Sequence, residues 1–532
     1  MSHPDHPFAN TSDGRATLRP RPSVTDLELA ALTLQRAEAA TMFTTHERSA
    51  GRSSDADDLR RTLPFAILVA WFACRIAGIT PTAATIHAII TDPSMSPATR
   101  RTLGLPVGEH HRDREADAAR LTLSYSSVCR AMAKITSHIE AGGLRDEARA
   151  RAAAFSHPVL LAAWALLPKD VRDEARGDVA LDSTLVPLGG QHAEARARAI
   201  AHGDTGDRGH CEVSAGWYFT GPSGGIGSTR DRRLGFGLEG HIGATRIGNG
   251  FPPFVFATEI DRPGRVDGER QFAMVSRLGA FTARAGTLTF GRAHAPLQPE
   301  TFHTPARGLG HALVFNIRTS DMGIQAAIEG AILVDGTWYC ACMPPALANA
   351  SGDHARGTLT DAAYAHRLAA RVRYTMRQKA IGSDRARVRL YAHRPVATSA
   401  RPCAYASARP VVPRGLGERY RQDIPYRTAP WNSAYVAGRN GTESLLRLVR
   451  QPLAEAAPYR GRGYGFAAID FAFVMAAQNT RIATAIAHDR APSEPTNGTS
   501  NSPAATPMPP IVASPEAPMR ANEASEENSR DA

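Results

Sequence analysis

The sequence of 532 residues has few cysteines, no apolar leader and no apolar run long enough for a membrane span. Its six cysteines are scattered along the chain, which is typical of reduced thiols and not of a disulfide framework. The longest apolar run, 63–74, ends at Arg75 and is too short to cross a bilayer. The first residues lack a charged segment followed by an apolar one. We therefore expect a cytoplasmic protein with no membrane role.

Two common ligand-binding patterns are also missing. Cys340-x-Cys342 with the distant Cys403 lacks the paired spacing of a zinc site, which favours apolar packing of these thiols. The glycine-rich stretch 221–227 has no lysine before its hydroxyl residues, so it is not a phosphate-binding loop and is predicted to be a hairpin turn.

The charge balance is basic. There are 62 Lys and Arg residues against 51 Asp and Glu residues, for a formal charge of +11 and a pI near 9.7. Such a balance favours a polyanionic partner. An arginine-rich composition also follows from GC-rich coding, so charge alone leaves nucleic-acid binding open.

Composition and periodicity divide the chain into six parts. We expect a loosely structured N-terminus (1–60), a helical module (61–177), the first part of a core domain (178–320), an insertion of β-hairpin and basic helix (321–430), the last part of the core (431–486) and a disordered tail (487–532). The tail is rich in Pro, Ser, Ala and Glu and has almost no large apolar residue, which is typical of disorder.

The helical module contains apolar residues at helical spacing between positions 128 and 139. It fits a helix-turn-helix that positions DNA, with Arg130 and Lys134 on its outer face. The pattern favours the alternative, a helical packing domain. The sequence leaves both readings open.

The core begins where the apolar pattern changes from helical to strand-like. We expect strands at 178–187, 210–220, 234–244, 254–260, 287–294 and 311–317, and helices at 268–284 and 299–307. Antiparallel strands followed by strands that alternate with helices make a mixed α/β sheet. The order of three strands, helix, strand, helix, strand is that of the RNase H-like fold.

Acidic and basic residues suggest a site on this sheet. Asp182 lies within an otherwise apolar strand, where an acid is costly unless it is paired or metal-bound. On a helix, Arg439, Glu443 and Arg450 project from one face and hold a carboxylate between two guanidinium groups. A metal-binding acid beside phosphate binders suits chemistry on a nucleic-acid backbone. The alternatives are a surface acid at 182 and an ordinary Arg439–Glu443 ion pair.

These residues also carry a resemblance. The chain resembles bacterial insertion-sequence transposases of the DDE type, in the group with a Tyr/Arg/Glu/Lys signature, over roughly residues 178–485. The motifs are Leu-Asp182-Ser-Thr, Gly291-Arg-Ala-His, the segment 330–344 and Arg439-Asn-Gly-Thr-Glu443. The signature residues correspond to Tyr435, Arg439, Glu443 and Arg450. Tyr435 is one residue farther from Arg439 than in the family, and Arg450 replaces the usual lysine.

The resemblance implies a fold, a cofactor and a partner. The fold would be RNase H-like, with an N-terminal helical module and an insertion before the last catalytic helix. Asp182 and Glu443 would be catalytic and would hold Mg²⁺ or Mn²⁺. Tyr435, Arg439, Arg450 and Arg292 would bind DNA phosphates. The partner would be DNA at the terminal inverted repeats of its element, bound by a homodimer in the cytoplasm, at the nucleoid.

The sequence departs from the family at the second acid. Where the family has Asp-Arg-Ala-Tyr after the fourth strand, this chain has Gly291-Arg292-Ala293-His294, and glycine cannot coordinate a metal. Other acids near the fold's expected site are Asp261, Asp267 and Asp321. Three functions remain: a transposase for strand cleavage and transfer, a catalytically inactive DNA-binding protein derived from one, and a repurposed nuclease that needs a substitute acid.

A last cluster of basic residues lies in the expected insertion, and consists of Arg371, Arg373, Arg377 and Lys379. These residues fit a solvated helix face. They fit equally well the DNA-contacting insertion that related transposases carry before the last catalytic helix.

Overall fold

A computed structural model describes residues 21–39, 55–105, 107, 123–141, 145–188, 215–220, 233–247, 252–291, 294–381, 384–392, 397–398, 401–402, 409–455 and 463–489. The chain divides into two compact units, Met1–His138 and Ile139–Ala532. The expected disordered tail lies outside the described residues from position 490 onward.

The first unit is helical where it is described. Its helices are α1 (Val24–Arg36), α2 (Asp55–Ile76), α3 (Ala83–Ile90), α4 (Pro97–Thr102) and most of α6 (Tyr125–Glu140). The helix α1 corrects the expectation of a loose start, because Ser23 and Asp26 form a capping box that satisfies its first backbone N–H groups. The apolar run in α2 is buried between its neighbours in the unit.

The helix α6 confirms the periodicity seen in the sequence. Its apolar stripe is buried, while Arg130 and Lys134 are exposed. A helix-turn-helix role for this unit stays a prediction.

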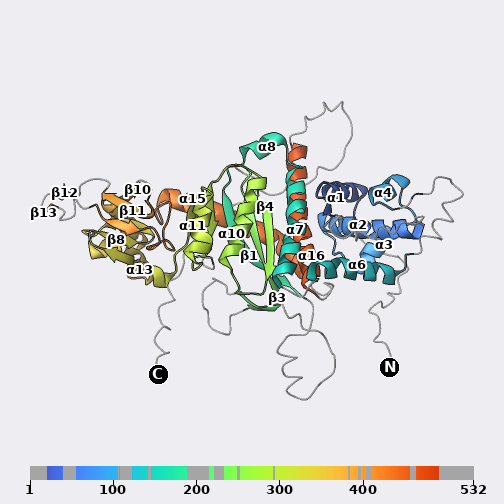
Figure 1. The fold of residues 1–532 in the computed structure, drawn as a ribbon, viewed down its shortest axis with the longest axis horizontal. Helices are drawn as coiled ribbons and strands as arrows, with labels where there is room; N and C mark the ends of the chain where they lie inside the picture. The colour runs from blue at the N-terminus through green and yellow to red at the C-terminus, as the bar shows by residue number, and fades with distance from the viewer. Residues whose placement is uncertain are drawn as a thin grey trace, which may run out of the picture. The chain divides into compact units, whose positions relative to one another are not determined.

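The first compact unit ends at His138, whereas the predicted helical module extends to residue 177. The next long helix, α7 (Arg145–Trp164), belongs to the second unit and lies beside α16 (Tyr464–Asp489), as Figure 1 shows. The ring of Phe155 packs on Phe473 at 5.5 Å, and the ring of Trp164 packs on Phe254 at 5.2 Å. Local periodicity identifies a helix, but packing on α16 and β4, which includes these aromatic contacts, decides which unit it joins.

The second unit is built on a six-stranded mixed sheet. Its strands are β1 (Val179–Pro187), β2 (Gly216–Thr220), β3 (Arg233–Thr245), β4 (Phe254–Asp261), β5 (Thr287–Phe290) and β6 (Ala312–Phe315). The order is β2-β3-β1-β5-β6, and β4 also pairs with β3. Strand β3 is antiparallel to its three neighbours, whereas β1, β5 and β6 are parallel.

The helices between these strands follow the predicted order. They are α10 (Gly268–Ser276) with the 3-10 turn η2 (Arg277–Ala280), and the π turn η3 (Pro299–His303) with α11 (Thr304–Gly308). The main differences are at the ends: the helix predicted to reach residue 284 ends at Ala280, and the strand predicted to reach residue 294 ends at Phe290. A mixed α/β fold is therefore confirmed.

Two long helices complete the core. Helix α15 (Ala429–Glu455) packs on β1, β5 and β6. Helix α16 is buried along most of its length and packs on α7 and β4. Its Asn479 amide accepts from the backbone N–H of Val255 at 2.9 Å and donates to the Val255 carbonyl at 2.7 Å, which satisfies the backbone of β4 at this point.

The insertion contains a two-stranded sheet of β12 (Ala397–Thr398) and β13 (Arg401–Pro402), three short α-helices and two three-stranded sheets. One sheet joins β7 (Ile324–Ile328), β8 (Ala331–Val334) and β9 (Thr337–Cys340), and the other joins β10 (Met376–Ile381), β11 (Asp384–Ala392) and β14 (Val411–Pro413). Its helices are α12 (Pro345–Ala348), α13 (Ala350–Ala355) and α14 (Asp361–Arg371). The predicted basic helix is wrong beyond Arg371, since Arg377 and Lys379 lie on the strand β10.

Candidate functional site

Asp182 lies on β1, in the middle of the sheet. It pairs with Ile242 of β3, and its side chain is 16% exposed. The backbone N–H of Ser183 donates to its Oδ1 at 2.9 Å. Burial raises the pKa of this carboxyl above its ordinary value, and the nearby guanidinium of Arg439 opposes that rise.

The end of β5 lies beside Asp182. In the parallel ladder, Ala180 pairs with Thr289 and Leu181 with Phe290, so the next position along β5 is Gly291. A Cβ atom added to Gly291 would lie 3.4 Å from Nη1 of Arg439. Position 291, where the resemblance implies a second acid, therefore lies at this site and carries no side chain.

Helix α15 carries the remaining site residues, Arg439 and Glu443. A Cβ atom on Gly438 would lie only 2.8 Å from Cβ of Thr289, so glycine permits the close approach of this helix to β5. One residue later, Nη1 of Arg439 lies 3.4 Å from Oδ2 of Asp182, and its Nε lies 2.8 Å from Oε1 of Glu443. The fold thus brings together Asp182, Arg439 and Glu443. Asp182 and Arg439 are 257 residues apart in the sequence.

The charges at this site balance around Arg439. Burial by itself lowers the pKa of its guanidinium, but the carboxylates of Asp182 and Glu443 outweigh burial and raise that pKa above its ordinary value. The Glu443 side chain is 52% exposed, so solvent and a solute can reach the pair from this side. Arg439 is the cation that both carboxylates share.

The other predicted phosphate binders are less close. Tyr435 is half-buried, and its ring stacks on Trp431 at 4.6 Å. Arg450 is exposed seven residues beyond Glu443, and among the described residues it forms no ion pair with that carboxylate. Of the two guanidinium groups expected to flank the Glu443 carboxylate, only that of Arg439 pairs with it. Arg292 lies outside the described residues.

None of the candidate substitute acids lies at the site. Asp261 pairs with Glu239, whose side chain is on the face of the sheet opposite to Asp182, and its Oδ2 is 2.7 Å from Arg270. Asp267 caps α10 by accepting from the N–H of Arg270 at 3.0 Å. Asp321 lies 3.9 Å from Arg419 in the insertion.

The described residues contain no group of three or more His, Cys, Asp or Glu side chains placed to hold a metal ion. At the site itself, two carboxylates flank a guanidinium and position 291 supplies no ligand. The donor set, as it stands, does not fit a divalent cation of the kind the resemblance implies.

The sequence analysis missed a buried polar layer on the opposite face of the sheet. Ser183 donates to Oε1 of Glu239 at 2.7 Å, and the rings of His241 and His294 lie 6.3 Å apart. The ring nitrogens of both histidines have no hydrogen-bond partner within the described chain. Burial, then His241, then Arg439 lower the pKa of His294 to about 3, so it stays neutral. The only sequence signal was a histidine in place of the family's tyrosine.

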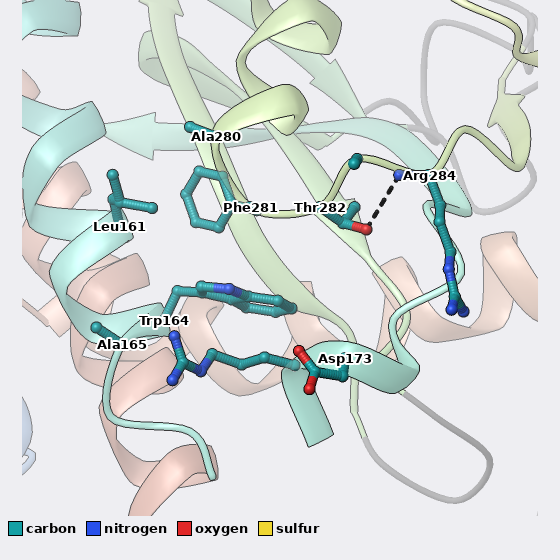
Figure 2. A pocket seen from close by; sticks show the side chains of 10 residues that line it. Leu161, Trp164, Ala165, Asp173, Ala280, Phe281, Thr282 and Arg284 are labelled. Carbon is teal, nitrogen blue, oxygen red and sulfur yellow. Dashed lines mark hydrogen bonds between the residues drawn. The ribbon is translucent and has the colours of Figure 1, made fainter. Parts of the chain in front are cut away.

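A surface pocket lies elsewhere in the second unit. It is lined by residues of α7 and of α8 (Lys169–Glu174) and by the segment that leads from η2 toward β5. Figure 2 shows Trp164 and Phe281 at its apolar end and Asp173 and Arg284 at its charged end. None of the predicted site residues lines this pocket.

Comparison with models of protein families, with curated proteins and with solved structures finds no match to this chain. Among the described helices, none is long and apolar enough to cross a membrane. The fold and the site define an α/β protein with an acidic pair bridged by arginine over the middle of a mixed sheet.

Proposed function

We propose that this chain is a DDE-type transposase-like protein with an RNase H-like core that binds DNA. One observation carries the proposal. Asp182 on the central strand β1, the end of the neighbouring parallel strand β5, and the Arg439–Glu443 pair of α15 meet at one point. This is the placement of acids that the resemblance implies for metal-dependent strand cleavage and transfer.

The strand order supports the RNase H-like part of the proposal. Three antiparallel strands, β4, β3 and β1, are followed by β5 and β6, which run parallel to β1, with helices α10 and α11 in the connections. The strand β2 is a short addition that pairs with one end of β3. Fold alone does not give function, so the site carries the argument.

A basic face in the insertion supports a DNA partner. Side chains alternate along β10 and β11: one face supplies Met376, Val388 and Leu390 to the apolar core of the insertion. The opposite face carries a group that we call the basic face, made of Arg377, Lys379, Arg387, Arg389 and Tyr391.

The composition of the basic face suits a nucleic-acid backbone. Lys379 pairs with Arg389 across the ladder, and Arg377 pairs with Tyr391. The guanidinium of Arg409 lies 5.7 Å from the ring centre of Tyr391. Clustered cations bind phosphates, and an aromatic ring offers a stacking surface for a base. Arg371 does not belong to this face, because it is buried in an ion pair with Asp335.

Gly291 favours a second candidate, a catalytically inactive DNA-binding protein derived from a transposase. It removes one acid without changing the basic face. The repurposed nuclease has less support, because the described substitute acids are engaged elsewhere. Under either leading candidate the partner is DNA, the element's inverted repeats being the preferred target, and the location is the cytoplasm. Binding as a homodimer is also part of the proposal.

Fluorescence anisotropy with labelled duplexes tests the DNA partner. We expect binding that falls steeply with salt, because phosphate contacts release counterions. The double substitution Arg377→Ser with Lys379→Ser should weaken binding to every duplex and reduce the slope of log affinity against log salt by about two.

The matched control is Lys169→Ser with Arg356→Ser, which removes the same charge from exposed side chains away from the basic face. Equal weakening by the two double variants would show that net charge alone is responsible. Absence of binding at low ionic strength would reject both DNA-linked candidates.

A further inference from the structure

The guanidinium of Arg439 is a positive charge within the candidate site. Arg439 lies between the two carboxylates, with Nη1 3.4 Å from Asp182 and Nε 2.8 Å from Glu443. Its guanidinium has a fixed fork of donors and remains charged at any ordinary pH. The attraction between the two acids and any external cation is therefore already partly neutralised.

Because Gly291 has no side chain, it leaves space beside the guanidinium of Arg439. The nearest atom to a Cβ built on Gly291 is Nη1 of Arg439, at 3.4 Å. A carboxylate at position 291 would extend from this Cβ into the space beside the guanidinium. In this chain that space holds a positive group and no third negative one.

The exposed fractions show that solvent reaches both ion pairs of Arg439. The side chains of Arg439, Glu443 and Asp182 are 38%, 52% and 16% exposed. Ion pairs that solvent reaches to this degree are weak. A phosphate is a better partner for guanidinium than one carboxylate oxygen at 3.4 Å, because it accepts two parallel hydrogen bonds.

We propose that Arg439 is a built-in counter-cation that closes the Asp182–Glu443 pair to divalent metal in the DNA-free protein. Removal of Arg439 opens the pair. A DNA phosphate that draws the guanidinium away opens it as well; this second clause rests on the proposed DNA binding, whereas the first does not.

Titration of the full-length, DNA-free chain with Mn²⁺, followed by the electron paramagnetic resonance of free Mn²⁺, tests the first clause. Arg439→Gln should bind one Mn²⁺ at least about tenfold more tightly than the wild type, because a unit charge ~4 Å from a divalent ion is removed. Lys169→Gln, which removes an exposed cation of α8 outside the candidate site, should behave as the wild type. Adding Asp182→Asn to Arg439→Gln should abolish the gain.

Arg439→Met, which keeps the apolar stem, is a second variant in case the glutamine changes folding, and thermal melting of each variant checks the fold. An affinity of both folded variants equal to or below that of the wild type would overturn the proposal.

A last arm adds duplex DNA to the wild type. Reciprocal coupling requires that DNA raise Mn²⁺ affinity if a DNA phosphate draws Arg439 away from the two carboxylates. DNA that binds without raising Mn²⁺ affinity would contradict the second clause. No DNA binding at all would reject the proposed function and leave the DNA-free comparison intact.

Discussion

Two arginine–carboxylate pairs in the second unit share their chemistry and differ in their surroundings. In the insertion, Arg371 and Asp335 are 2% and 1% exposed, with Nη1 and Oδ2 2.6 Å apart. In the core, Arg439 and Asp182 are 38% and 16% exposed, and the closest atoms are 3.4 Å apart. A buried pair cannot lose one member without leaving an unpaired charge, whereas a partly exposed pair can exchange partners. Arg371 therefore serves the fold, and Arg439 is available for function.

The partners of the two arginines lead to the same distinction. Arg371 also donates to the carbonyl of Leu347 at 2.8 Å, and Asp335 accepts from the N–H of Gly323 at 2.9 Å, so this buried network is well satisfied. The second partner of Arg439 is Glu443, which is half-exposed.

The largest expected effect is the loss of stability when the buried Arg371–Asp335 ion pair is broken. Arg371→Met should lower the free energy of unfolding by ~3–5 kcal/mol, because it leaves the Asp335 carboxylate buried and unpaired. Arg439→Met should change it by no more than ~1 kcal/mol. Urea denaturation of both variants makes the comparison, and Arg371→Met with Asp335→Asn should recover part of the loss. Equal losses for the two single variants would remove the distinction.

An effect of intermediate size concerns His294, a buried group with no hydrogen-bond partner among the described residues. An unfolded histidine takes up a proton near pH 6.5, whereas burial, His241 and Arg439 lower the pKa of folded His294 to about 3. Between these values the unfolded state binds more protons, so the free energy of unfolding falls as the pH falls. The loss is ~1.4 kcal/mol per pH unit within this window.

Between pH 7 and pH 4.5, we therefore expect the free energy of unfolding to fall by ~2–3 kcal/mol less in His294→Phe than in the wild type. Urea midpoints at the two pH values measure this difference. Parallel pH profiles for the wild type and His294→Phe would show that His294 is not neutral in the fold.

The smallest expected effect is at Gly291. Gly291→Asp should change the free energy of unfolding by no more than ~1 kcal/mol, because the added Cβ meets only the end of a flexible side chain at 3.4 Å and the residue has no positive φ. Gly438→Ala should cost ~1–3 kcal/mol, since its Cβ would lie 2.8 Å from Thr289 and push α15 off the sheet. Thermal melting of the pair checks this, and a larger loss at position 291 would contradict the placement of the site.

The strands and helices of the core could be predicted because their signals are local. The segments that became β1, β4 and β6 are short, mostly apolar and bounded by polar residues, so their positions differ from the prediction by a few residues at most. Glu443 and Arg439 could be paired from their spacing on a helix.

Long-range partners could not be predicted. Arg371 looked like its basic neighbours because its partner Asp335 is 36 residues away and no local pattern connects them. Arg377 and Lys379 lie on a strand and not on the predicted helix, because β10 pairs with β11. Strand β11 supplies apolar residues to the core of the insertion. The place of α7 in the second unit depended on aromatic contacts with residues far along the chain.

The assignment of Asp182, Glu443 and position 291 to one site on DNA is tested most directly by nicking of supercoiled plasmid in magnesium. The proteins to compare are the wild type, Asp182→Ala, Gly291→Asp, and Gly291→Asp with Asp182→Ala. We predict little or no nicking by the wild type, more by Gly291→Asp, and none once Asp182 is replaced. Strong wild-type nicking that survives Asp182→Ala would contradict the account, because the chemistry would then lie at other residues.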